Sequence, residues 1–190
     1  MLESLFRECL SLSSKLRPNY SESLGTRAEN WEETFGRSGN EIPLFFKSIY
    51  NHVSGTRRDI NQQELMDFIP GYRLIHITEI TKEKENVKNI LVEDYLNESD
   101  NIIPFLTNYS SDFYCIIKNA VGEESICVLT NDSGEPIEYS RSPQKFFETI
   151  IEFYRSGVYF LDHDGYLDYD YEKQRSIGSK INKGVSYWVD

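Results

Sequence analysis

The sequence predicts a single α+β domain in which a central, mainly antiparallel sheet is flanked by helices. Two short runs of β-branched and aromatic residues, 113–117 and 125–129, are joined by turn residues and indicate an antiparallel hairpin. The first run holds five apolar residues in a row, which need cover on both faces, so we expect the hairpin in the middle of the sheet. Amphipathic segments precede and follow it, and 190 residues suffice for one core.

Residues 1–40 are expected to form a helical extension that packs on the body of the domain. Apolar residues at three- and four-residue spacing predict a helix over 1–17, which a proline ends. A helical turn is expected over 29–35 and a loop over 36–40. The remaining residues, 41–190, are expected to form the α+β domain.

The next segment predicts a helix, a strand and a second helix in succession. Pro43 suits the first turn of a helix over 41–53, because its missing N–H has no intrahelical partner to lose. After a Pro-Gly turn, residues 72–77 are rich in β-formers and predict a strand. Thr78 is then expected to cap a charged helix over 78–95.

The C-terminal part predicts a helix followed by a small hairpin. Ser142 as N-cap and Pro143 at the first helical position mark a helix that ends near Tyr154. The runs 158–161 and 166–169 flank an Asp-Gly turn, which is a strong signal for a tight hairpin. The apolar residues of the tail are expected to dock on the body: Ile177, Ile181, Tyr187 and Trp188.

The net charge indicates which partners the chain attracts. With 20 basic and 31 acidic residues, the formal net charge is −11. A field of this sign repels nucleic acid and anionic membranes, and it attracts basic partners. Direct binding to nucleic acid or membrane is therefore not expected, although the same charge would also serve solubility alone.

Cellular location and cofactors are inferred from patterns that the sequence lacks. No run of eighteen apolar residues and no signal-peptide layout is present, so we expect a cytoplasmic protein. Cys9, Cys115 and Cys127 have no metal-ligand spacing and are expected to be free thiols. No cofactor is expected.

Four groups of short motifs follow one another along the chain. They are Ile42-Pro43 with Ile49-Tyr50-Asn51, Ile69-Pro70-Gly71-Tyr72-Arg73-Leu74, Ile103-Pro104-Phe105 with Asp112-Phe113-Tyr114-Cys115-Ile116, and the helix from Pro143 to Tyr154. This order resembles the SUKH superfamily, which is named after a yeast cell-wall synthesis regulator and is abundant in bacteria. The resemblance covers roughly residues 40 to 155. The chain departs from the common pattern in its N-terminal extension and in lacking a tryptophan before Pro104.

The resemblance implies a SUKH-like α+β domain that functions by binding another protein. Most bacterial members look like immunity proteins, which bind a secreted or contact-delivered toxin, often a nuclease. Eukaryotic members act as regulatory scaffolds. We therefore expect an immunity protein, or antitoxin, that occludes a basic cognate toxin, with a regulatory scaffold of the same fold as the alternative. The oligomeric state does not follow from the sequence.

The candidate partner-binding surface is an acidic, tyrosine-bearing stretch, 162–172, which contains neither lysine nor arginine. Rigid aromatic residues are typical of protein interfaces, but a solvated hairpin with one charged face would show the same pattern. A second candidate is the loop that leads into the central hairpin. The candidate residues are Asp162, Asp164, Tyr166, Asp168, Tyr169 and Asp170 in the first stretch, and Tyr109 and Asp112 in the loop.

Metal binding and catalysis have less support in the sequence. Clustered carboxylates suit calcium, so a calcium- or ligand-binding module stays open, but the EF-hand template fails. Counted from Asp162, Gly165 is fourth and Lys173 is twelfth, where that template needs its glycine sixth and a glutamate twelfth. The histidines lie outside any catalytic or metal-binding motif: His52, His76 and His163. We expect no enzymatic activity and no bound metal.

Overall fold

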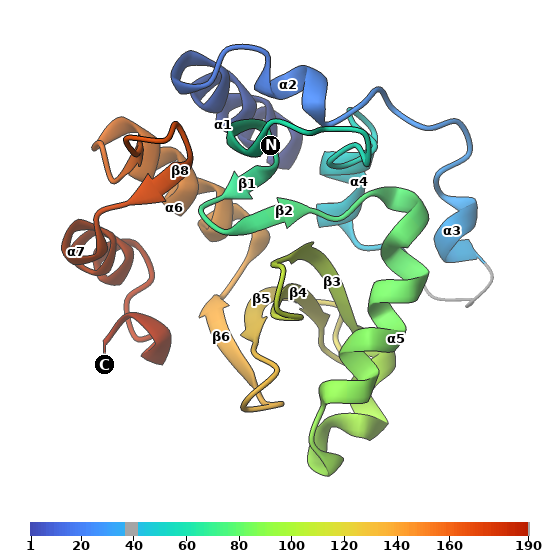
Figure 1. Cartoon of the computed structure of the whole chain (residues 1–190). Coiled ribbons are helices and arrows are strands. Elements are labelled where there is room, and N and C mark those ends of the chain that lie inside the picture. Colours follow the sequence, from blue (N-terminus) through green and yellow to red (C-terminus); the bar gives the residue numbers. More distant parts are fainter. Residues whose placement is uncertain (37–41, 190) are drawn as a thin grey trace.

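The computed structural model describes residues 1–36 and 42–189, and its centre is a six-stranded antiparallel sheet (Figure 1). The strands lie side by side in the order in which they occur along the chain. They are β1 (Asp67–Ile69), β2 (Tyr72–Leu74), β3 (Ile102–Thr107), β4 (Phe113–Lys118), β5 (Glu124–Leu129) and β6 (Pro136–Ser140). A second, antiparallel sheet pairs β7 (Tyr159–Leu161) with β8 (Leu167–Tyr169). The predicted fold class, a single α+β domain, is confirmed.

The hairpin in the middle of the sheet is the predicted one. β4 and β5 pair in antiparallel register with Cys115 opposite Cys127, and β3 and β6 flank them. Consecutive residues are buried from Phe113 to Ile116, and successive strand residues point to opposite faces, so both faces of β4 are covered. The three cysteines are buried and free, as predicted.

Helices cover the sheet on one face and along one side. They are α1 (Leu2–Leu16), α2 (Tyr20–Ser23), α3 (Glu33–Gly36), α4 (Leu44–Tyr50), α5 (Ile80–Ile90), α6 (Pro143–Arg155) and α7 (Tyr171–Ile181), with 3-10 turns η1 (Gln63–Leu65), η2 (Ile77–Glu79), η3 (Glu93–Asn101) and η4 (Ser186–Trp188). Phe45 of α4 and Phe146 of α6 place their rings 4.6 and 5.3 Å from that of Phe105 in β3. α5 packs alongside β3 (Figure 1). No helix in the described ranges is both long enough and apolar enough to cross a membrane.

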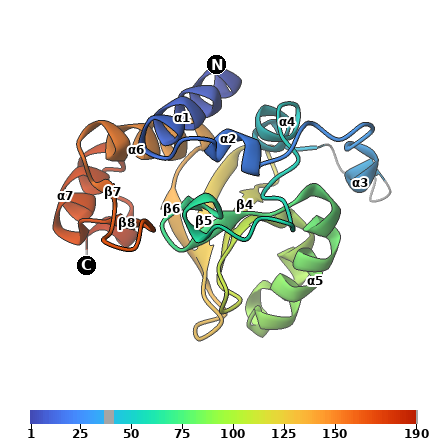
Figure 2. The same cartoon turned by 45° about the horizontal axis from the view of Figure 1, so that its top comes forward.

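The N-terminal helix shares the core of the domain. Phe6 and Cys9 of α1 are buried, and the Phe6 ring packs 6.0 Å from that of Phe147 in α6. α1 therefore lies along α6, as Figure 2 shows. Of the predicted loop over 36–40, Gly36 instead ends α3. Residues 37–40 and the predicted boundary between residues 40 and 41 lie outside the described residues.

A carboxylate distant in the sequence caps α4. Pro43 is the N-cap residue rather than a member of the first turn, so the predicted helix over 41–53 is shortened at both ends. Glu124, at the start of β5, accepts the amide N–H groups of Leu44 at 2.7 Å and Phe45 at 3.2 Å. The capping group is thus supplied by a strand about eighty residues away.

The segment between β2 and α5 differs from its prediction. The strand ends at Leu74 rather than residue 77, and His76, not Thr78, caps the turn that leads into α5. The His76 ring accepts the Thr78 amide, while the Glu79 carboxylate accepts the His76 amide, so the two form a capping box. The predicted helix also ends early, at Ile90. The last predicted residues, 93–95, belong instead to the 3-10 helix η3.

The C-terminal tail docks on the body through Trp188, as predicted. Trp188 is buried and donates its Nε1–H to the carbonyl oxygen of Tyr139 in β6 at 2.8 Å. A Cβ atom on Gly178 of α7 would lie 2.2 Å from the Trp188 ring, so only glycine allows this approach. The preceding helix α6 begins where predicted, because Ser142 Oγ accepts the Lys145 amide at 3.2 Å. Helix α7 itself was not predicted.

Candidate functional site

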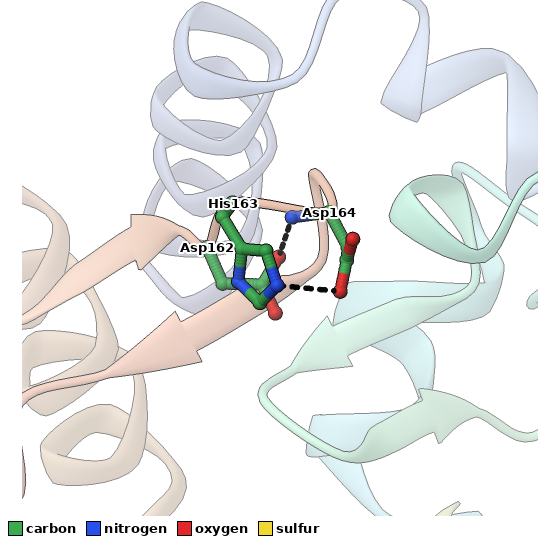
Figure 3. A group of neighbouring side chains, drawn as sticks. All are labelled: Asp162, His163 and Asp164. Carbon is green, nitrogen blue, oxygen red and sulfur yellow. Dashed lines mark hydrogen bonds and ion pairs between the residues drawn. The ribbon is translucent and has the colours of Figure 1, made fainter.

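The turn of the β7–β8 hairpin is organised by Asp162 (Figure 3). Its Oδ1 accepts the amide N–H of Asp164 at 2.9 Å and that of Tyr166 at 2.8 Å, which is an Asx-type turn. Gly165 completes the turn with φ of +86°, as the predicted Asp-Gly signal requires. The Asp162 carboxylate is therefore already hydrogen-bonded to backbone amides of the turn.

Three side chains at this turn lie close enough together to share a cation. Ligand atoms of Asp162, His163 and Asp164 all lie within 4.8 Å of one another, and His163 Nε2 is 3.1 Å from Asp164 Oδ2. His163 and Asp164 are exposed, and the Asx turn already accounts for Asp162. Nothing else at the turn points to a metal ion.

The acidic and aromatic residues of β8 face opposite ways. The strand register sets Asp168 opposite Phe160, and Tyr169 opposite the buried Tyr159. Because side chains alternate along a strand, Asp168 points away from the body and Tyr169 toward it. Asp168 and Tyr169 therefore lie on opposite faces of the hairpin.

Asp170 has a role in helix α7 rather than a free carboxylate. It is the N-cap residue, and it accepts the Lys173 amide at 3.0 Å and pairs with the Lys173 ammonium at 3.2 Å. The Lys173 backbone and side-chain bonds hold the pKa of Asp170 below its usual range. Asp170 thus stabilises the start of α7.

The loop that leads into β4 is held by Asp112. Its carboxylate accepts the Asn108 side-chain amide at 2.8 Å and the Asn131 backbone amide at 2.9 Å. Asn108 Oδ1 accepts the amides of Ser110 and Asp112, which closes the loop. Tyr109 projects from this loop with 61% of its surface exposed.

Four elements bring tyrosines into one group, which we call the tyrosine cluster: Tyr72 of β2, Tyr114 of β4, Tyr139 of β6 and Tyr187 of η4. Neighbouring ring centroids are 4.9 Å apart for Tyr72 and Tyr114, and 5.0 Å apart for Tyr114 and Tyr139. Those of Tyr139 and Tyr187 are 4.8 Å apart. Tyr114 and Tyr139 are buried, whereas Tyr72 is half-buried and Tyr187 is exposed, so the cluster has a buried floor and an accessible rim.

The electrostatic setting keeps these phenols neutral. Burial, together with smaller contributions from Asp112, Tyr187 and Tyr169, raises the pKa of Tyr72 to about 12. Burial likewise raises the pKa of Tyr114 and Tyr139, and partial burial of its ring raises that of Tyr187. Asp112, which precedes Tyr114 by two residues, and Tyr169 both interact electrostatically with Tyr72, so we call these two residues the border of the cluster.

Two predicted candidates from separate segments thus meet at a site that the sequence did not reveal. Asp112 and Tyr169 were predicted, whereas Tyr72, Tyr114 and Tyr139 were not proposed as site residues, and Tyr187 was expected only to dock. Asp164 lies elsewhere: it lines a cavity of about 380 Å³ with Arg17 and Glu64. The Tyr109 hydroxyl lies 3.4 Å from the Gln63 side-chain amide, beside β1.

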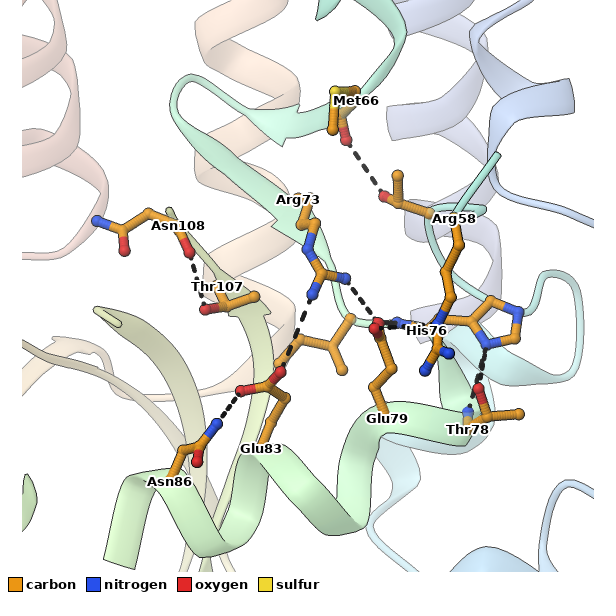
Figure 4. Close-up of polar contacts among 12 residues, drawn as sticks. Arg58, Met66, Arg73, His76, Thr78, Glu79, Glu83, Asn86, Thr107 and Asn108 are labelled. Carbon is orange, nitrogen blue, oxygen red and sulfur yellow. Dashed lines mark hydrogen bonds and ion pairs between the residues drawn. The ribbon is translucent and has the colours of Figure 1, made fainter. Parts of the chain in front are cut away.

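A network of charges at the start of α5 is the other polar centre of the domain (Figure 4). Arg73 lies 2.8 Å from Glu79 and 4.0 Å from Glu83, and Arg58 lies 3.2 Å from Glu79. Burial acts to raise the pKa of Glu79, but the hydrogen bond and charge of Arg73, with Arg58, hold it below its usual range. Burial lowers the pKa of His76. The network joins β2 to α5 and stabilises the fold.

No family model matches the chain, and no curated protein matches it.

Proposed function

We propose that this chain is a bacterial immunity protein that binds a basic cognate toxin and neutralises it by occlusion. Support comes from the motif order, the α+β fold, the net charge of −11 and above all the tyrosine cluster with Asp112 at its border. Tyrosines that are rigidly packed and partly exposed are the residues on which protein interfaces depend most. Such a protein needs no catalytic group of its own and acts in the cytoplasm.

The proposed mechanism has two steps. The acidic field first steers a basic toxin surface toward the chain, which speeds association at low salt. Burial of the exposed tyrosines then slows dissociation, because packed aromatic anchors contribute most of the binding free energy. A nuclease toxin is favoured, since such enzymes present cationic substrate grooves that an acidic partner can fill.

The test is a rescue experiment guided by gene order. We expect a neighbouring gene to encode a multidomain secreted protein with a toxic C-terminal domain. Co-expression of this chain should restore growth to cells that produce that domain. A toxin-free locus, together with no rescue from candidate toxins, would remove the proposal.

A further inference from the structure

We propose that the tyrosine cluster, with Asp112 and Tyr169 at its border, is a receptor for an arginine side chain of the protein partner. This inference rests on the proposed function only for the identity of the protein that carries the arginine. The chemistry of the receptor comes from the hydroxyl groups, the ring faces and the single carboxylate that the fold brings together there.

The first argument is a surplus of hydrogen-bond acceptors. Each phenol has one O–H donor and an oxygen that accepts two hydrogen bonds, so a group of phenols offers more acceptor sites than donors. Tyr72 and Tyr187 carry the phenols that an incoming donor can reach, because Tyr139 is only 1% exposed. A guanidinium carries five N–H donors and no acceptor, which is the complement of this surface.

The second argument is charge. Asp112, two residues before Tyr114 in the loop that leads into β4, gives the border of the cluster one negative charge, while the phenols remain neutral. An anionic ligand would be repelled there, and a cation gains both the Asp112 carboxylate and the tyrosine faces. Within the described ranges, the cation–ring contacts on tyrosine are Arg17 with Tyr20 and Arg175 with Tyr171. The rings of the cluster are therefore not taken by the chain's own cations.

The third argument is that the fold already holds an arginine by the same means. The buried Arg17 guanidinium lies 3.9 Å from the centroid of the Tyr20 ring and 3.2 Å from the Tyr154 hydroxyl. It also donates to the carbonyl oxygen of Asp67 at 2.7 Å. A ring face, a phenol oxygen and further oxygen acceptors thus hold the two terminal nitrogens of one guanidinium inside the domain. The tyrosine cluster offers the same groups at the surface.

Exposure allows a side chain to enter. Tyr187 and Tyr169 are each 37% exposed, and Tyr72 is half-buried, whereas Tyr114 and Tyr139 form the floor. The elements that carry these residues are fixed by the sheet and by the docked Trp188, so the receptor is preorganised and little conformational entropy is lost on binding.

The test is a titration of the full chain with blocked tripeptides, followed by NMR of labelled tyrosine rings. Acetyl-Gly-Arg-Gly-amide should shift the rings of Tyr72, Tyr169 and Tyr187, with a dissociation constant on the order of a millimolar. The lysine tripeptide should bind a few-fold more weakly, because an ammonium can neither stack on a ring face nor form the paired hydrogen bonds of a planar guanidinium. The citrulline tripeptide, which keeps the shape but not the charge, should bind at least about ten-fold more weakly.

Variants locate the binding. Asp112→Asn and Tyr187→Ala should each weaken the arginine tripeptide about five-fold. Tyr187→Phe keeps the ring and its packing, and it should weaken binding about two-fold to three-fold by loss of one hydroxyl. An exposed control, Asp132→Asn, should leave binding unchanged.

Any one of three results would overturn the receptor. The first is equal affinity for the arginine and citrulline tripeptides, and the second is equal affinity for the arginine and lysine tripeptides. The third is unchanged arginine binding in both Tyr187→Phe and Asp112→Asn. The outcome is separable from the fate of the proposed function. Toxin rescue without arginine binding removes the receptor alone, and arginine binding without any toxin removes the immunity role alone.

Discussion

Arg17 illustrates how a single residue ties the N-terminal helix to the rest of the domain. It is 1% exposed, and its guanidinium donates to the carbonyl oxygens of Asp67 and Glu64 and to the hydroxyls of Ser13 and Tyr154. These acceptors belong to α1, the η1–β1 segment and α6. Removal of the cation would leave them buried without donors, which costs more than the loss of an exposed ion pair.

Arg17→Ala is therefore expected to lower the free energy of unfolding by about 3 kcal/mol or more. Arg7→Ala, at an exposed position on the same helix, should change it by less than about 0.5 kcal/mol. Urea denaturation of the two variants provides the comparison. Equal effects would show that the buried contacts of Arg17 do not stabilise the fold.

We predict that removal of the hydroxyl has opposite effects on stability at two buried tyrosines. Tyr50 donates to the carbonyl oxygen of Ile75 at 2.7 Å, whereas the Tyr139 hydroxyl has no partner in the part of the chain that the structure describes. Tyr50→Phe should cost about 1–2 kcal/mol of stability, and Tyr139→Phe should be neutral or stabilising by up to about 1 kcal/mol. Thermal unfolding of both variants tests this. A larger loss in Tyr139→Phe than in Tyr50→Phe would contradict the assignment of the unpartnered hydroxyl.

At the scale of elements, local sequence signals predicted some parts of the fold and not others. The β4–β5 hairpin, α1 and α6 carry their own periodicity, turns and caps, so their residues identify them. The cap of α4 comes from Glu124, and His76 caps the turn before α5 through its ring, which is not a common capping group. Helix α7 carries few apolar residues, and its two isoleucines, Ile177 and Ile181, are only partly buried. These features depend on contacts distant in the chain or on weak patterns.

The same reason explains how much of the site was predictable. Asp112 and Tyr169 were identified because each lies in a polar, aromatic segment. The tyrosine cluster joins residues 72, 114, 139 and 187, and no spacing rule connects positions so far apart. Only the sheet order and the docked tail bring them together.

The junction between β2 and α5 predicts how stability depends on pH. The folded-state pKa of Glu79 is lowered, so its contribution is fully present above the unfolded pKa of a glutamate, about 4.3, and is lost as the pH falls through the lower folded value. Glu79→Gln should therefore reduce stability at neutral pH and flatten its acid decline. Glu85→Gln, on the exposed side of α5, is the matched control. Denaturant midpoints between pH 7 and pH 3 measure both, and parallel curves for Glu79→Gln and the native chain would contradict this role.

The β7–β8 hairpin allows charge to be changed without changing the fold. Charge reversal at Asp164 and Asp168, which are exposed, should slow association with a basic toxin and leave the melting temperature close to that of the native chain. Asp170 is left out because it caps α7, and its reversal should lower the melting temperature. Stopped-flow association at low salt measures the effect. Unchanged rates and unchanged salt dependence would show that this hairpin does not face the toxin.

The whole molecule combines a long-range field with a short-range aromatic surface. The net charge of −11 acts over about 10 Å at 0.1 M salt, whereas the tyrosine cluster acts only on contact. The two properties predict separate kinetic effects. Salt and surface carboxylates should change the association rate, and the tyrosines should change the dissociation rate.

The most direct test of the central claim is the binding kinetics of the purified chain with the toxic C-terminal domain encoded beside it. We predict saturable binding that abolishes toxin activity, an association rate that falls steeply with salt, and a dissociation rate that rises at least about ten-fold in Tyr187→Ala. Asp132→Asn should leave the dissociation rate unchanged. A toxin that remains fully active in the presence of excess protein, or a dissociation rate that Tyr187→Ala leaves unchanged, would contradict occlusion through the tyrosine cluster.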